Sequence, residues 1–157
     1  MPRYVDFTPD KKLQLADGTV TIATGQDAFL DTTVAGATPI FDVGSAAADL
    51  RVVVDVTSCS LNTDNVYSLH IYGSNDATMT TGLVLLGTLM LGHSTLIGTA
   101  SHRGVGRHSF TCSNIGSNSP ASYAAQVLTP LRYVKAAIYA SGISGSINFQ
   151  AWITAAK

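Results

Sequence analysis

An alternation of apolar and polar side chains between residues 50 and 56 is the feature that most constrains how this chain can fold. In Leu50-Arg51-Val52-Val53-Val54-Asp55-Val56, every even-numbered side chain is apolar, and Arg51 and Asp55 lie between them. Because successive side chains of an extended segment point to opposite faces, a period of two places one face against a core. Side chains branched at Cβ also disfavour a helix. The segment therefore predicts a β-strand with one buried face.

The same period of two recurs twice more in the sequence. In residues 66–72, Tyr67, Leu69 and Ile71 alternate with Ser68, His70 and Tyr72. Residues 132–140 and 146–154, separated by the Gly- and Ser-containing segment 141–145, predict a β-hairpin. In the second strand of this hairpin, the side chains expected to point inward are Ile147, Phe149, Ala151 and Ile153, and those expected to point outward are Asn148, Gln150, Trp152 and Thr154.

Weaker strand patterns bring the expected count to about eight, as in a double-sheet jelly roll. They cover residues 13–15, 19–23, 29–34, 82–91 and 107–112. Only residues 121–128 and the run Ala46-Ala47-Ala48 have helical character, and both are short. Alternation without a βαβ rhythm is typical of antiparallel sheets with one wet face. The sequence therefore predicts an all-β fold, an antiparallel jelly roll or β-sandwich.

Length and composition indicate one domain with a surface poor in charge. A chain of 157 residues is within the usual size of one domain, so we expect a single domain over residues 1–157 with an N-terminal arm over residues 1–12. Hydrophobic residues make up 46% of the chain and charged residues only 12%. We therefore expect a partner to cover part of the apolar surface.

The charge pattern argues against nucleic acid and membrane as partners. The net charge is −1 and the nine Lys and Arg residues are scattered, which leaves no basic stripe for a phosphate backbone. The most apolar run, residues 83–91, is far shorter than the ~20 residues that a membrane-spanning helix needs. No apolar segment typical of a signal peptide follows Arg3, so we expect the protein to assemble in a cytosol.

Side chains that could perform chemistry do not form a recognisable motif. His70, His93, His102 and His108 lack the spacing of a metal site, and the His-x-His pair of metal-binding jelly-roll enzymes is missing. Cys59 and Cys112 are too few for a disulfide framework and are expected to be two small, partly buried thiols. We expect no enzyme activity, no metal and no cofactor.

Six residues are candidates for an interface. Tyr72 and Trp152 point outward in the alternating patterns, where such rings either shield neighbouring backbone or dock a partner. Tyr4 and Phe7 lie in the N-terminal arm. Arg103 and Arg107 lie near three of the histidines in a Gly-containing stretch, residues 92–108, which is expected to include a solvated loop.

Several segments resemble the capsid cement (decoration) proteins of short-tailed bacteriophages. The resemblance is found in residues 4–12, 67–74, 132–137 and 145–153, so it extends over nearly the whole chain. It implies a jelly-roll fold, a homodimer on the outer capsid surface, and contacts that bridge subunits of the major capsid protein. A trimer is the alternative oligomer. The resemblance also implies a virion protein that is assembled in the host cytoplasm and stabilises the shell.

A carbohydrate-binding β-sandwich of a virion is the competing function. In that case Trp152 and Tyr72 would stack on sugar rings, and Asn148 and Gln150 would donate and accept hydrogen bonds beside Trp152. Two or three aromatic rings on one exposed face, with Asn, Asp or Gln between them, would favour this alternative, and only Trp152 with Asn148 and Gln150 approaches that pattern.

Overall fold

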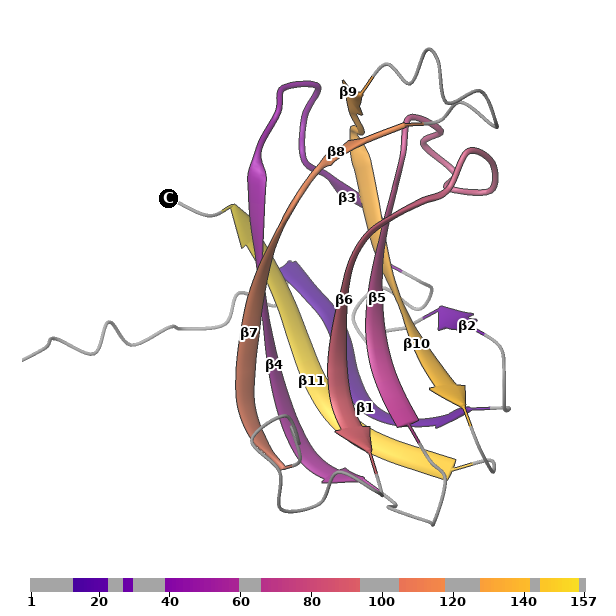
Figure 1. Ribbon diagram of the computed structural model, residues 1–157, viewed down its shortest axis with the longest axis vertical. Coiled ribbons are helices and arrows are strands. Elements are labelled where there is room, and N and C mark those ends of the chain that lie inside the picture. The colour runs from indigo at the N-terminus through magenta and orange to yellow at the C-terminus, as the bar shows by residue number, and fades with distance from the viewer. Residues whose placement is uncertain are drawn as a thin grey trace, which may run out of the picture.

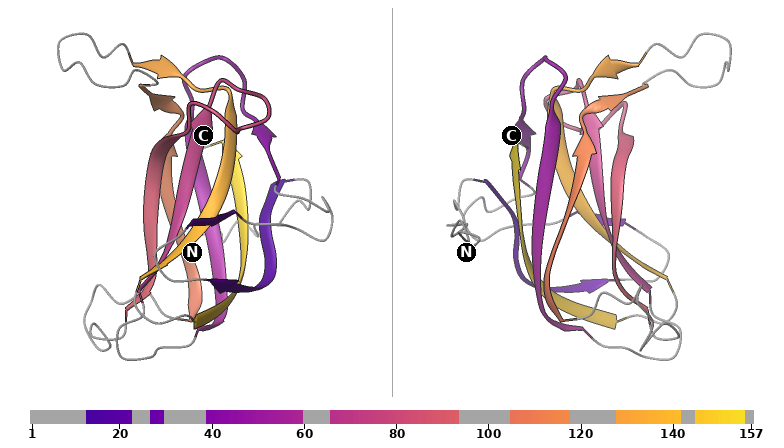
Figure 2. Two further views of the ribbon diagram at one scale, coloured as in Figure 1. Left: turned by 90° about the vertical axis from the view of Figure 1, so that its right-hand side faces the viewer. Right: turned by 60° about the vertical axis from the view of Figure 1, so that its left-hand side comes forward.

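The computed structural model describes residues 13–22, 27–29, 39–59, 66–93, 105–117, 128–141 and 145–155. These residues form strands and contain no helix, as the alternating patterns predict. The longer strands belong to two antiparallel sheets that pack face to face (Figure 1), and Figure 2 shows the two layers from the side. The predicted all-β, antiparallel fold is confirmed. The N-terminal arm, residues 1–12, lies outside the described residues.

The first sheet has four strands in the order β1-β11-β4-β7. The alternation at 50–56 has the predicted effect: Leu50, Val52, Val54 and Val56 are all buried against the core. Weak patterns at 13–15 and 19–23 belong to one continuous strand. The strand bounds are β1 (Gln14–Ile22), β11 (Gly145–Ala155), β4 (Asp49–Cys59) and β7 (Gly106–Ser113).

The second sheet has the order β2-β10-β5-β6, and a further short strand, β3, also pairs with β10. Two more short strands, β8 and β9, pair with each other at the top of Figure 1. Four of the strands are only two or three residues long, which is why the predicted count of about eight is too low. The strand bounds are β2 (Asp27–Phe29), β10 (Tyr133–Ser141), β5 (Val66–Ser74), β6 (Val84–His93), β3 (Phe41–Asp42), β8 (Ile115–Gly116) and β9 (Thr129–Pro130).

The predicted C-terminal hairpin is wrong. Strands β10 and β11 form at the predicted positions, but they belong to different sheets: β10 pairs with β5, and β11 pairs with β1 and β4. An alternating pattern shows that a strand has one buried face, but it does not show which strand lies beside it. The side chains of β11 that were predicted to point inward do so: the core contains Ile147, Phe149, Ala151 and Ile153.

Side chains from both sheets fill the core between the layers. A glycine brings the sheets close together along the side where β6 faces β7: a Cβ atom on Gly87 would lie 2.9 Å from Cε2 of Phe110 and 3.0 Å from Cβ of Cys112. The core residues of the second sheet are Tyr67, Leu69, Ile71, Leu89, Leu91, Val134, Ala136, Ile138 and Ala140.

The run Ala46-Ala47-Ala48 is not helical, because Asn114 forms hydrogen bonds with the backbone groups of Ala46 and Ala48. The Asn114 amide oxygen accepts a 2.8 Å hydrogen bond from the Ala48 N–H, and the Asn114 side-chain nitrogen donates to the Ala46 carbonyl at 2.9 Å. The Asn114 backbone N–H donates to the Ala48 carbonyl at 3.0 Å. The second segment with predicted helical character, 121–128, lies outside the described residues except for Leu128.

Candidate interaction surface

The outward face of the second sheet carries a regular array of side chains that we call the outer grid. Three side chains come from each of three neighbouring strands, and the register aligns them in three cross-strand rows. In the row order β6, β5, β10, these are Leu85, Tyr72 and Lys135; Thr88, His70 and Ala137; and Met90, Ser68 and Tyr139. The array is fixed by the hydrogen-bonded ladders beneath it.

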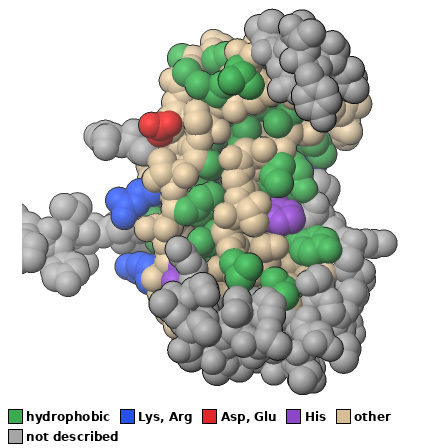
Figure 3. Space-filling model, in the orientation of Figure 1, with side chains coloured by type: hydrophobic (Ala, Val, Ile, Leu, Met, Phe, Trp, Pro, Cys, Tyr) green, Lys and Arg blue, Asp and Glu red, His purple; other side chains and the backbone are tan. Residues whose placement is uncertain are grey.

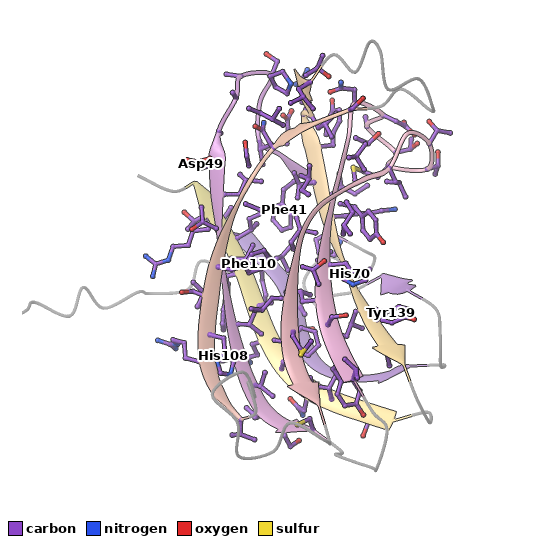
Figure 4. The ribbon with its side chains drawn as sticks, viewed as in Figure 1. Phe41, Asp49, His70, His108, Phe110 and Tyr139 are labelled. Atoms are coloured by element: carbon purple, nitrogen blue, oxygen red, sulfur yellow. The ribbon has the colours of Figure 1, made fainter. Side chains whose placement is uncertain are left out.

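Aromatic rings occupy the middle of the outer grid. The His70 ring stacks on the Tyr139 ring with centroids 5.5 Å apart and planes inclined by 13°. The Tyr72 ring meets His70 edge to face at 6.1 Å. A 3.1 Å hydrogen bond joins Ser68 Oγ and His70 Nε2. Figure 4 shows His70 and Tyr139 side by side on β5 and β10. These contacts hold the three rings in place before any partner arrives.

Apolar side chains of β6 extend the outer grid toward the edge of the sheet. Leu85 is 49% exposed and Met90 is 38% exposed, and Thr88 between them is also exposed. Large apolar side chains with this exposure, grouped on one face beside aromatic rings, are typical of surfaces that bind other proteins. In Figure 3 the described part of this face is mainly green and tan, with the red and blue side chains at its left margin.

The single Lys of the outer grid does not present its charge to solvent. Lys135 is buried, and its Nζ donates a 2.6 Å hydrogen bond to the carbonyl of Met79, in the loop that joins β5 to β6. Burial lowers the pKa of Lys135, although the nearby Asp76 carboxylate opposes this shift. The exposed part of the outer grid is therefore free of Lys, Arg, Asp and Glu.

The loop that binds Lys135 is organised by one carboxylate. Asp76 accepts hydrogen bonds from the backbone N–H and the hydroxyl groups of Thr78, Thr80 and Thr81, at 2.8–3.1 Å. These bonds, led by that of the Thr78 hydroxyl, hold the pKa of Asp76 well below its ordinary value. Met79 adopts a left-handed backbone conformation with φ of 51°, and its side chain is fully buried. These contacts fix the conformation of the loop and hold the Met79 carbonyl within hydrogen-bonding distance of Lys135 Nζ.

The outward face of the first sheet is polar by comparison. Arg107 donates two 2.7 Å hydrogen bonds to the Asp55 carboxylate, from Nε and Nη2. This contact lowers the pKa of Asp55. Arg51, Ser109, Thr111 and Gln150 are exposed on the same sheet. The two outward faces of the molecule therefore differ sharply in charge.

The structure describes three of the six predicted interface residues, and these three do not form one surface. Tyr72 lies in the outer grid, whereas Arg107 lies on β7 in an ion pair with Asp55. Trp152 lies on the outward side of β11 but is only 5% exposed, so it offers little surface to a partner. Tyr4, Phe7 and Arg103 lie outside the described residues.

Sequence reasoning missed most of the outer grid. It tested His70 only as a metal ligand, a role that it rejected, and it did not single out Tyr139, Leu85 or Met90. The alternation at 66–72 already placed Ser68, His70 and Tyr72 on one face. The missing information was the strand order, since residues 85–90 and 135–139 join this face only because β6 and β10 flank β5.

The described residues contain no group that suggests metal binding. No three His, Cys, Asp or Glu side chains among them are placed to hold a metal ion, although His102 and the side chain of His93 lie outside this set. None of the described residues forms a helix that is long and apolar enough to cross a membrane.

The two cysteines are unpaired with each other and poorly suited to act as nucleophiles. Burial raises the pKa of Cys112 to about 11, with a further contribution from Asp49, and burial also raises the pKa of Cys59. Both thiols therefore stay protonated near neutral pH. This agrees with the prediction of two small, partly buried thiols.

Comparison with known proteins gives no relative: no family model, no curated protein and no solved structure matches this chain.

Proposed function

We propose that this protein is a structural virion protein that decorates the outside of a bacteriophage capsid and bridges major capsid protein subunits. The observation that carries the proposal is the outer grid, a rigid aromatic and apolar face without exposed charge. The resemblance of residues 4–12, 67–74, 132–137 and 145–153 to capsid cement proteins supplies the identity of the partner. In this proposal the useful output of the molecule is contact surface, and the protein is not an enzyme.

We further propose that the two sheets form a jelly roll. The strand orders β1-β11-β4-β7 and β2-β10-β5-β6 support this, because the chain passes repeatedly from one sheet to the other: between β1 and β2, β3 and β4, β4 and β5, β6 and β7, β7 and β10, and β10 and β11. Such crossings are expected of the two Greek keys of a double-sheet jelly roll. If β2 and β3 are taken as one interrupted strand along β10, and the small β8–β9 pair is set aside, eight strands remain.

The outer grid has the properties of an efficient binding surface. Rings that are already stacked lose little conformational freedom when a partner binds, so more of the contact energy appears as affinity. Tyrosine is enriched among the residues that contribute most to interfaces, and the Tyr72 and Tyr139 side chains combine ring area with a hydroxyl group. Many copies on one shell would add many such contacts, and copies that touch two subunits would gain avidity.

The same geometry favours a protein partner over a sugar. A sugar ring binds best on the open face of an aromatic ring. The faces of His70 and Tyr139 are stacked on each other, and Trp152 is almost fully buried. Of the two stacking platforms of the carbohydrate-binding alternative, Trp152 is therefore largely inaccessible, and Tyr72 is already in edge-to-face contact with His70.

Co-sedimentation tests the proposed function. Purified protein is mixed with empty, expanded shells of the major capsid protein from the same genome. We expect saturable binding, with a dissociation constant raised at least tenfold in Leu85→Glu and Met90→Glu, because each variant places a charge in a desolvated contact. Ser58→Glu and Gln150→Glu, which add the same charge on inner strands of the first sheet, are the controls and should bind like the unmodified protein.

Two results would contradict the proposal at different levels. Absence of binding by the unmodified protein would overturn the capsid function. Normal binding by Leu85→Glu and Met90→Glu would show that the shell is contacted by a surface other than the outer grid. In the first case, a glycan array probed with the unmodified protein and with Tyr72→Ala would test the carbohydrate-binding alternative.

A further inference from the structure

The two sheets present four edges, and the edges differ in how well they could accept another strand. An edge strand offers unpaired N–H and C=O groups to any extended chain, so proteins usually shorten, bend or charge their edges. The edge strands of the first sheet are β1 and β7. Those of the second sheet are β6 on one side and the short strands β2 and β3 on the other.

Three of these edges are interrupted. The pairing of β6 with β5 shifts register twice, between Tyr67 and Ser68 and between Ile71 and Tyr72. The pairing of β1 with β11 shifts between Gln14 and Ala16. Strands β2 and β3 are three and two residues long. Bulges and short strands are the usual means by which an edge avoids further pairing.

Strand β7 is the exception. It pairs with β4 over eight consecutive residues, from Gly106 opposite Val56 to Ser113 opposite Asp49, without a register shift. Within the described residues only β4 pairs with it. The strand contains no proline, and its exposed outward side chains include the small polar Ser109 and Thr111. This edge is regular and long enough to accept a full strand.

The one charged side chain of β7 does not protect the edge. A lysine or arginine on an edge strand normally discourages pairing through repulsion and solvation. Arg107 is instead tied to Asp55 of the neighbouring strand through two hydrogen bonds of 2.7 Å, so its charge is matched within its own chain. An approaching strand therefore meets a locally neutral surface.

We propose that two copies of this chain associate by antiparallel pairing of their β7 strands. The two four-stranded sheets would then join into one sheet of eight strands, 4 + 4, that runs through the dimer. A two-fold axis perpendicular to the sheet relates the copies, because antiparallel pairing of identical strands has this symmetry. Opposite residues must point to the same face, so the axis passes midway between one residue of β7 and the same residue of the second copy.

The sequence of β7 is compatible with this symmetry in its central registers. With the axis at Phe110, Ser109 lies opposite Thr111 of the second copy, and Arg107 lies opposite Ser113. With the axis at Ser109, Arg107 lies opposite Thr111. Neither register brings two Arg107 side chains face to face, and like charges directly opposite would be unfavourable. A second copy fits this edge because it supplies an equally long and regular strand whose side chains are compatible in these registers.

The resemblance already implies a homodimer, and the proposal goes beyond it and beyond the proposed function by assigning the dimer interface to β7, a surface separate from the outer grid. The outer grid belongs to the second sheet and β7 to the first, so pairing through β7 leaves both outer grids of the dimer available. A molecule with two such faces could contact two capsid subunits at once. Avidity of this kind requires simultaneous engagement of both sites.

Sedimentation equilibrium of the full chain, without shells, tests the dimer. We expect the unmodified protein to be dimeric and Ser109→Lys/Thr111→Lys to have a dimer dissociation constant at least tenfold higher, because lysines then face each other in both registers. Ser58→Lys/Gln150→Lys adds the same charge on inner strands of the same sheet and is the matched control. Circular dichroism of each variant confirms that it is folded.

Hydrogen exchange provides a second readout that a general loss of stability would not mimic. In the dimer, the N–H groups of β7 that point away from β4 should exchange slowly, and the lysine variant should lose protection at those amides alone. A monomeric unmodified protein, or a lysine variant as dimeric as the control, would overturn the proposal. Either result leaves the shell-binding test untouched, so the two proposals fail independently.

Discussion

His70 and Tyr139 stack across two neighbouring strands of the second sheet, with ring centroids 5.5 Å apart and planes inclined by 13°. The register does not place them directly opposite each other: His70 faces Ala137, and Tyr139 faces Ser68. The contact is therefore diagonal, and the small Ala137 side chain leaves room for it. This diagonal pair fixes the centre of the outer grid.

The first prediction concerns the energy of that pair. A double-mutant cycle with His70→Ala and Tyr139→Ala should give a coupling of about 1 kcal/mol, the usual size for stacked rings beyond their buried area. The measurement is urea unfolding of the four proteins. A coupling energy within error of zero would mean that the two rings are neighbours that do not stabilise each other. The stacked pair would then give no reason to regard the outer grid as rigid.

The second prediction concerns the close approach of the two sheets at Gly87. Gly87→Ala should destabilise the protein by about 1–3 kcal/mol, because the new Cβ has to displace Phe110 or Cys112. Gly18→Ala is the matched control: a Cβ there meets nothing within 4 Å, and its effect should stay within about 0.5 kcal/mol. Thermal or urea unfolding measures both.

A compensating change sharpens this test. Phe110→Leu removes ring atoms from the contact, so Gly87→Ala should cost less in that background than in the unmodified protein. Strictly additive effects of the two substitutions would contradict the proposed collision between Gly87 and Phe110.

The third prediction concerns Asn114, which ties three segments together. Its side chain accepts from Ala48 N–H and donates to the Ala46 and Leu131 carbonyls. Asn114→Ala should cost about 3 kcal/mol, because the side chain is fully buried and three backbone groups lose their hydrogen-bond partner. Asn75→Ala removes one exposed hydrogen bond to Arg132 N–H and should cost less than about 1 kcal/mol. Equal effects in urea unfolding would show that burial of the Asn114 bonds is unimportant.

The fourth prediction concerns acid stability. The pKa of Asp76 is depressed by the threonine hydrogen bonds, so the unfolded chain binds a proton at this site more readily than the native protein does. The resulting stabilisation is complete above the ordinary carboxyl pKa of about 3.9 and declines as the pH falls below it. Asp76→Asn should therefore lower stability most at neutral pH, and the difference from the unmodified protein should shrink at pH 3.

Thr80→Val offers a graded comparison for the Asp76 test. It removes one hydroxyl donor to Asp76 and keeps the backbone N–H donor, so its pH-dependent loss should have the same sign and be smaller. A loss of stability in Asp76→Asn that is independent of pH would assign the effect to loop shape alone.

Local patterns predicted the strands well, because a strand with one buried face has apolar and polar residues in alternation along its sequence. The inward sets of β4, β5 and β11 follow from alternation alone, and β6 and β7 start within two residues of the predicted positions. What alternation does not encode is which strands lie side by side. That depends on long-range pairing, and it is the reason why the C-terminal hairpin was wrong.

The candidate surface was only partly predictable for the same reason. Tyr72 was identified because its strand is regular, but its neighbours Leu85 and Lys135 come from strands about 13 and 63 residues away along the chain. Trp152 shows the converse problem. It occupies the outward side of its strand as predicted, yet it is buried, and alternation describes the direction of a side chain without describing what covers it.

The placement of β10 and β11 has a consequence for synthesis on the ribosome. Each is an interior strand of its sheet, with β10 between β2 and β5 and β11 between β1 and β4. When residues 1–132 have left the ribosome, several strands still lack the neighbours with which they form most of their hydrogen bonds. Strand β1, which pairs with β11, is one of them. Neither layer can be completed until residues 133–155 have emerged, and a nascent chain halted before residue 133 would leave five strands without one of these neighbours, namely β1, β2, β3, β4 and β5.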